Sequence, residues 1–204
     1  MRNSIDLYGA LTGNCIRAAI ALDEAGIGYT PKPIDLAAGE QQGEQLLGLN
    51  EFGKVPVLVE RRDDGNFVLT QSNAIIFFAA ERSQNVLLPA DPLARAKVYE
   101  CFFYFLTDVI AVSHGAFRLD HVGARDHASH INEQVRASLI GGERFLRSSE
   151  FMAGDTFSVA DIAAFTIARA FHGNIQWANH PELARWFETV ARRPAVVQGL
   201  RAFE

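Results

Sequence analysis

Strand-like segments are confined to the first part of this chain, and only helix-like segments follow them. The β-rich apolar runs are residues 5–8, 29–36, 57–60 and 67–70. Helical spacing of apolar residues is found between them at 15–25 and after them at 72–82. The order strand, helix, strand, short helix, strand, strand, helix is that of a thioredoxin-like α/β domain. It predicts a mixed four-stranded sheet.

From residue 91 onward the sequence predicts helices alone. Pro92 follows Asp91, and a proline is favoured in the first turn of a helix that begins after such a cap. Four or five helices are expected, and the clearest are 158–170 and 181–192. We therefore predict a thioredoxin-like domain over 1–82, a linker over 83–91 and an all-helical (all-α) domain over 92–204.

The composition excludes several classes of function. The net charge is -5 and the Lys and Arg residues are scattered, so no basic face for nucleic acid is expected. The longest apolar runs are too short to span a bilayer, and polar residues interrupt any signal-peptide-like stretch near the N-terminus. Cys15 and Cys101 provide no disulfide framework and suit a reducing compartment. We expect a cytoplasmic protein that binds neither nucleic acid nor a membrane.

Pro56 precedes a short apolar run, in the segment 53–58 (GKVPVL). A proline in this position usually marks the start of a strand, and some such bonds are cis. A cis bond would turn the backbone of Val55 outward, leaving its N–H and C=O for an extended peptide. Ser72 is expected to open the next helix, whose N-terminus can bind a carboxylate. A peptide site beside an anion site predicts a small acidic peptide as ligand, and glutathione fits that description.

Three motifs together resemble the glutathione transferase family. They are 54–58 (KVPVL), 70–75 (TQSNAI) and 154–162 (GDTFSVADI). Each is modest alone, whereas all three in this order and at these separations are typical of that fold. The start of the chain is most similar to bacterial transferases that use Thr or Ser after the first strand, with some resemblance to the nu class. The resemblance implies a homodimer that uses glutathione as co-substrate and no metal.

Thr12 and Asn14 stand directly before the first expected helix and are the candidate catalytic residues. Conjugation requires the glutathione thiol as a thiolate, which a hydroxyl near a helix N-terminus can stabilise. Either residue could be a simple N-cap, but the downstream motifs favour Thr12 as thiolate stabiliser and Asn14 as its assistant. Cys15 is the alternative, in the second position of a CxxC-like spacing. A packed structural role is expected for it and for Cys101.

The resemblance also implies which residues hold the rest of glutathione. Ser72 is expected to bind the γ-glutamyl carboxylate and Gln71 the amino group, although the two would form a capping pair in any case. Many relatives have Glu at the Gln71 position, and the neutral amide loses a charge-assisted contact of about 1.5–3 kcal/mol. Val55 is expected to bind the cysteinyl unit. Gln41 and Lys54 could reach the glycyl carboxylate, and Lys54 could equally be a solvated surface charge.

The electrophile site is expected between the turn after the first strand and the first long helix of the second domain. The candidates to line it are Tyr8, Leu11, Tyr104 and Asp108. Aromatic residues at helical spacing are at least as often part of a core, so this assignment is open for each of them.

Two other features have ordinary interpretations. His127 and His130 share a helical face, but a pair without a third ligand is weak evidence for a metal site. Ser158 and Asp161 have the spacing of a capping box, to which we assign a folding role and no catalytic one.

Three functions remain open at this point. The first is a glutathione transferase that conjugates glutathione to small apolar electrophiles. The nu-like resemblance also permits a glutathione-dependent disulfide or peroxide reductase that uses two glutathiones. The third is a non-catalytic binding protein with the same fold, against which the retention of Thr12, Val55–Pro56 and Gln71–Ser72 argues.

Overall fold

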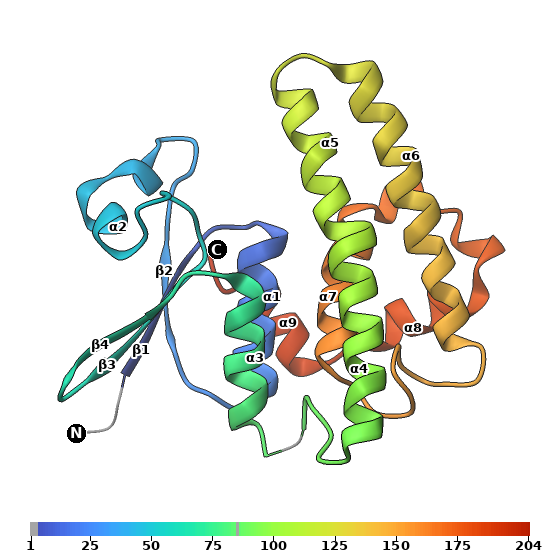
Figure 1. Ribbon diagram of the computed structural model, residues 1–204, viewed down its shortest axis with the longest axis horizontal. Coiled ribbons are helices and arrows are strands. Elements are labelled where there is room, and N and C mark those ends of the chain that lie inside the picture. The colour runs from blue at the N-terminus through green and yellow to red at the C-terminus, as the bar shows by residue number, and fades with distance from the viewer. Residues whose placement is uncertain (1–3, 85) are drawn as a thin grey trace. The chain divides into compact units, whose positions relative to one another are not determined.

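The computed structural model describes residues 4–84 and 86–204, which form two compact units (Figure 1). The first unit runs to Leu87 and also includes Arg193–Glu204, and the second is Leu88–Arg192. This division differs from the expected one, in which everything after residue 91 formed a single helical domain. The difference arises because α9 (Pro194–Leu200) packs against α1 (Gly13–Glu24), and Arg193 forms a two-pronged ion pair with Glu24 at 2.6 and 2.7 Å.

A four-stranded mixed sheet forms the centre of the first unit, as predicted (Figure 1). Its strands are β1 (Ser4–Gly9), β2 (Thr30–Pro33), β3 (Val57–Arg62) and β4 (Gly65–Leu69), in the order β2-β1-β3-β4. β1 pairs in parallel with β2 and antiparallel with β3, which pairs antiparallel with β4. β2 is shorter than expected and lies at an edge, since Pro31 and Pro33 have no N–H to donate.

Helices cover both faces of this sheet. α1 packs against α3 (Ser72–Arg82), whose bounds agree with the predicted helix. A smaller apolar cluster joins Tyr8, Val57 and Val59 to Leu46 of α2 (Glu44–Leu49), and η1 (Glu40–Gln42) precedes α2. Leu7 and Leu58, a cross-strand pair, point to the opposite face because side chains alternate along a strand.

The described residues of the second unit form helices joined by loops and contain no strand, as predicted. Its elements are α4 (Pro92–Tyr104), the π-helical turn η2 (Phe105–Ile110), α5 (Ala111–His121), α6 (Arg125–Gly141), η3 (Gly142–Leu146), α7 (Val159–Ala170), η4 (His172–Asn174), η5 (Trp177–Asn179) and α8 (Pro181–Ala191). α5 and α6 form an antiparallel hairpin (Figure 1). The predicted capping box is present at the start of α7, with Ser158 as N-cap and Asp161 as the acid. Within the described ranges, no helix combines the length and apolar character needed to cross a membrane.

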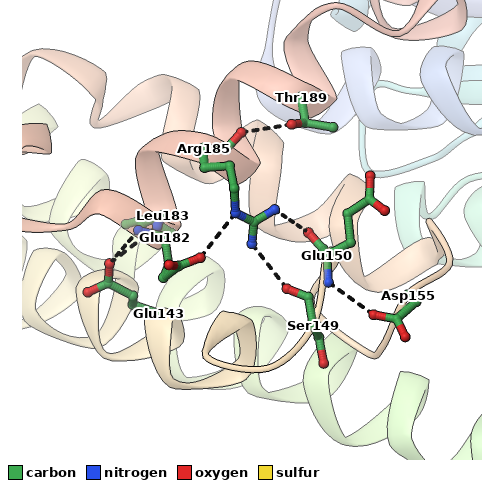
Figure 2. Close-up of polar contacts among 8 residues, drawn as sticks. All are labelled: Glu143, Ser149, Glu150, Asp155, Glu182, Leu183, Arg185 and Thr189. Atoms are coloured by element: carbon green, nitrogen blue, oxygen red, sulfur yellow. Dashed lines mark hydrogen bonds and ion pairs between the residues drawn. The ribbon is translucent and has the colours of Figure 1, made fainter.

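Arg185 fastens α8 to the loop that precedes α7 (Figure 2). Its guanidinium donates to the Glu182 carboxylate at 3.0 Å and to the carbonyls of Ser149 and Glu150 at 3.0 and 3.2 Å. At the start of the same helix, the Glu143 carboxylate accepts the Glu182 N–H at 3.1 Å. The charged side chains therefore satisfy backbone groups that helix and loop ends leave open.

Gly199 allows α9 to lie directly on the backbone of α1. A Cβ atom there would lie 2.7 Å from Cγ1, 2.8 Å from N and 2.9 Å from Cα of Ile20. We expect Gly199→Ala to lower the free energy of unfolding by about 1–3 kcal/mol, because a backbone cannot yield as a side chain does. Urea denaturation measures this. Gly48→Ala on α2, which meets nothing within 4 Å, is the matched control and should be neutral or slightly stabilising.

Candidate active site

Three segments of the first unit meet at one end of its sheet. The cross-strand pair Tyr8–Val57 places the end of β1 beside the start of β3, and the pair Leu58–Leu69 places the end of β4 there as well. The turn at 10–12, the segment 53–56 and the segment 70–72 therefore all lie at the same edge. The sequence predicted functional residues in each of these segments, and strand register brings them to one place.

Thr12 is the N-cap of α1, with an extended backbone at φ -117 and ψ 152. Its hydroxyl accepts the Cys15 N–H at 3.5 Å and donates to the Cys15 Sγ at 3.2 Å. Thr12 is partly exposed, and Asn14 is partly exposed in the first turn of the helix. A hydroxyl hydrogen rotates freely, so the Thr12 O–H can leave the Cys15 sulfur for an acceptor outside the helix.

Cys15 is fully buried beneath Thr12, with 0% of its surface exposed. Burial raises the pKa of its thiol, and the hydrogen bond from Thr12, the backbone of Ala10 and the charge of Arg17 oppose this only in part. The thiol is therefore neutral and inaccessible at neutral pH, which suits the packed role that the sequence predicted. Cys101 is also buried, and its Sγ donates to the Met152 carbonyl at 3.0 Å.

The Val55–Pro56 peptide bond is cis. Among the described residues, no hydrogen bond involves the Val55 N–H or C=O, so both are open to an extended ligand. The neighbouring Lys54 carbonyl accepts the Asn50 side-chain amide at 2.7 Å. Asn50 is buried and fixes this loop, and nothing in the sequence pattern singled it out.

The start of α3 offers backbone N–H groups at the same edge. Gln71 occupies the N-cap position with an exposed side chain that makes no capping hydrogen bond, and Ser72 is the first, buried residue of the helix. Asn73 Oδ1 is a buried acceptor without a partner in the described chain. An uncapped helix start of this kind is suited to a carboxylate.

Gln41 lies in η1, next to the loop that leads to Val55. The carbonyl of Gln41 would meet a Cβ atom on Gly53 at 3.0 Å, and the side-chain amide of Gln42 donates to the Gly53 carbonyl at 3.4 Å. Gln41 Oε1 is buried and has no partner within residues 4–84 and 86–204. Lys54 is exposed. Gln41 and Lys54 are thus neighbours across Gly53.

The residues expected to line an electrophile site have differing surroundings. In the first unit, Tyr8 is 7% exposed and packs in the cluster with Leu46 and Val57, whereas Leu11 is 58% exposed. In the second unit, the Tyr104 hydroxyl donates to the Ser138 carbonyl at 2.6 Å.

Two further positions belong to the second unit. The Arg144 guanidinium lies 4.5 Å from the centroid of the Tyr104 ring. Asp108 is exposed on η2 and accepts the Thr107 hydroxyl at 2.9 Å. The assignment of these residues to an electrophile site stays a prediction.

The histidines provide no evidence for a metal site. His127 and His130 are both exposed on α6. Across the described part of the chain, no group of three or more His, Cys, Asp or Glu side chains is placed to hold a metal ion.

Family models match most of the chain. The model for the glutathione S-transferase N-terminal domain matches residues 3–81, and the one for the C-terminal domain matches residues 115–194. Together they cover more than half of the chain, and both place their domains in the order that the fold shows.

Individual proteins are similar over almost the full length. A Zea mays protein named glutathione S-transferase 3 is 32% identical over 207 residues, covering 94% of this chain and 90% of its own. The disulfide-bond oxidoreductase YfcG of Escherichia coli is 27% identical and covers 96% and 94%. A solved glutathione transferase homologue from Sulfitobacter, with bound glutathione, has a TM-score of 0.81, 25% identity and 95% coverage of each chain.

Proposed function

The chain belongs to the glutathione S-transferase family and is a glutathione transferase enzyme, and on this premise we propose that it conjugates glutathione to small apolar electrophiles. One observation carries the proposal: the Thr12 hydroxyl, the open Val55 backbone and the uncapped start of α3 lie at one end of the sheet. They match the thiol, the peptide backbone and the carboxylate of a single small peptide.

The proposed binding mode assigns each end of glutathione to a segment. The Val55 N–H and C=O pair with the cysteinyl unit, as an added strand would. The γ-glutamyl carboxylate accepts from Ser72 and the first N–H groups of α3, and Gln71 receives the amino group. The glycyl carboxylate lies toward Gln41 and Lys54, whose backbones are neighbours across Gly53.

In the proposed reaction, the Thr12 hydroxyl turns from the Cys15 sulfur to the glutathione sulfur and donates to it. The positive end of α1 adds to the stabilisation of the thiolate, whose proton passes to solvent. The thiolate then forms a bond to the electrophilic carbon, and the electron pair of the broken bond leaves with the leaving group or is protonated. Cys15 takes no part, because it is buried and un-ionised.

A second candidate function is glutathione-dependent reduction of a disulfide. The similarity to the Escherichia coli disulfide-bond oxidoreductase favours it, because that relative matches nearly the whole chain. The same bound thiolate would attack one sulfur of the disulfide, and a second glutathione would resolve the mixed disulfide and leave as oxidised glutathione. The two reactions share Thr12 and differ in the second substrate.

The proposal includes a homodimer in the cytoplasm. Membership of the family supports the homodimer. The cytoplasmic location is supported by the free state of Cys15 and Cys101, both buried and unbridged.

Isothermal titration of the purified protein with reduced glutathione is the first test. Binding between micromolar and low millimolar dissociation constants supports the proposal, and the protein is then assayed in parallel with an aryl halide electrophile and a small disulfide. Turnover of the electrophile alone supports conjugation, and turnover of the disulfide alone supports the second candidate. Absence of binding at millimolar glutathione would contradict both and favour a non-catalytic binding protein.

A further inference from the structure

Arg17 is a buried cation whose hydrogen-bonding capacity is mostly unused. Arg17 lies on α1 and only 3% of its surface is exposed. Its Nε donates to the Gly13 carbonyl at 3.2 Å. Its Nη1 is buried and has no partner anywhere in the described residues. A guanidinium carries five N–H donors, so a buried one is normally matched by a carboxylate or by several carbonyls.

The described residues supply no counter-charge to Arg17. Among the described residues it is in no ion pair, and Cys15 is the titratable group that acts on it electrostatically. The other ionisable groups of α1 and of its neighbouring helix α3 are Asp23, Glu24, Glu81 and Arg82, and α9 itself contains none. Of these, Asp23 is bonded to Tyr29 and Gln198, Glu24 to Arg193, and Arg82 to Glu60. An unpaired buried charge costs several kcal/mol.

Cys15 is not the missing anion. Burial raises the pKa of its thiol above the usual value, and the charge of Arg17 opposes that only weakly. Burial lowers the pKa of Arg17 to about 10, so its guanidinium is still charged at neutral pH. The cation is therefore present, and the side chain that could have neutralised it is itself neutral.

The side chain of Arg17 runs back along α1 to its first turn. The bond to the Gly13 carbonyl sets this direction, and Nη2 lies 3.8 Å from the place where a Cβ atom of residue 13 would be. Gly13 follows Thr12 directly, so the guanidinium lies at the same turn as the hydroxyl proposed to hold the glutathione sulfur. The carboxylate sites at α3 and at Gln41–Lys54 belong to other segments.

We propose that the counter-charge of Arg17 is the thiolate of bound glutathione, and that Arg17 is a positioning residue that favours the ionised sulfur at Thr12. The inference rests on the proposed function, since it requires glutathione at this end of the sheet. Thr12 supplies the hydrogen bond, and Arg17 supplies the field of a full charge from within the protein. No covalent step is involved, and the thiol proton passes to solvent.

The test is a spectroscopic titration of enzyme-bound glutathione, followed by the ultraviolet absorbance of its thiolate. Arg17→Met, of similar length and without charge, should raise the pKa of the bound thiol by about 1–2 units, and Arg17→Lys should restore most of that shift. S-methylglutathione, which cannot ionise at sulfur, should bind wild type and Arg17→Met alike. Affinity for glutathione itself should fall at neutral pH.

Stability of the ligand-free protein gives a second readout. Because the charge of Arg17 is in no ion pair within the described chain, Arg17→Met should leave thermal stability unchanged or raise it. An unchanged pKa of the bound thiol in Arg17→Met would overturn the proposal, and so would equal losses of affinity for both ligands. If Arg17→Met fails to fold, Arg17→Lys is used instead, because lysine keeps the positive charge. A bound thiol in Arg17→Lys with the same pKa as free glutathione would then overturn the proposal.

Failure of the wider proposed function has a different signature. In that case wild type itself would bind no glutathione, or would leave the thiol pKa at its free value. A normal shift in wild type that persists in Arg17→Met contradicts the role of Arg17 alone.

Discussion

Thr12→Val is expected to reduce kcat for conjugation by about 10²–10³-fold and to change glutathione affinity little. Valine keeps the shape and the branched Cβ of threonine but has no hydroxyl, so the thiolate would lose the donor that we propose for it. In the proposed binding mode, the carboxylate and backbone contacts of glutathione would be made by other segments, at Val55 and α3. Steady-state kinetics and calorimetric titration together separate the two effects.

Thr12→Ser is the matched control, because it retains the hydroxyl and should keep most of the activity. Thr12→Val also removes the N-cap that accepts the Cys15 N–H, which costs about 1 kcal/mol of stability. Assays are therefore made well below the unfolding temperature of the variant. A kcat within threefold of wild type would remove Thr12 from the mechanism and turn attention to Asn14.

Asp161→Ala is expected to lower the free energy of unfolding by about 3–5 kcal/mol. Asp161 is 0% exposed and its carboxylate holds three parts of the second unit together. Oδ1 accepts the Met152 N–H at 2.9 Å and the Trp186 indole N–H at 2.8 Å. Oδ2 accepts the N–H of Ser158 at 2.9 Å and its hydroxyl at 3.1 Å. Alanine would leave these donors buried without partners.

Urea denaturation followed by tryptophan fluorescence checks this result, since Trp186 reports on the same site. Asp155→Ala is the control, because Asp155 is exposed and accepts the Glu150 N–H at 3.3 Å, and it should change stability by less than about 0.5 kcal/mol. A loss for Asp161→Ala no larger than that of Asp155→Ala would contradict the structural role of the carboxylate.

The same carboxyl group gives stability a defined pH dependence. Burial raises the pKa of Asp161 to about 6, because desolvation outweighs the hydrogen bonds it accepts. In the unfolded chain an aspartate has a pKa of about 3.9. The folded protein therefore binds this proton more tightly than the unfolded chain does. The contribution of the protonated Asp161 to the free energy of unfolding is fully present below the unfolded-state pKa, and it is lost as the pH rises through about 6. Asp161→Asn, which does not titrate, should lack this slope, and an identical slope in both proteins would contradict the assignment.

Local signals were sufficient to predict much of the fold. The bounds of α3 agree with the predicted helix because an apolar helical pattern lies between two polar residues. Ser72 begins the helix and Ser83 follows its end. The capping box at Ser158 and Asp161 is likewise a short-range feature. The sequence allowed a cis bond before Pro56, because cis peptide bonds are almost confined to those that precede proline.

Long-range contacts were not predictable in the same way. No local pattern indicates that residues 193–204 group with the first unit, since the contact between α9 and α1 joins Gly199 to Ile20 across most of the chain. Nor does a lone arginine in an amphipathic helix signal that it is buried, as Arg17 is. Asn50 falls in the same class, because its role depends on the position of the Lys54 carbonyl. The three segments that meet at the edge of the sheet could be identified from the sequence, whereas the residues that support them could not.

The return of residues 193–204 to the first unit has a consequence for the order of events during synthesis on the ribosome. The Phe203 ring lies against Gly9, at the end of β1 and beside the turn that carries Thr12. The ribosome synthesises the whole of the second unit before residues 193–204. Until these residues emerge, the first unit lacks the segment that packs on Ile20 and Gly9. A nascent chain halted before residue 193 would contain the three segments that meet at the edge of the sheet, and it would lack the residues that pack on β1 and α1.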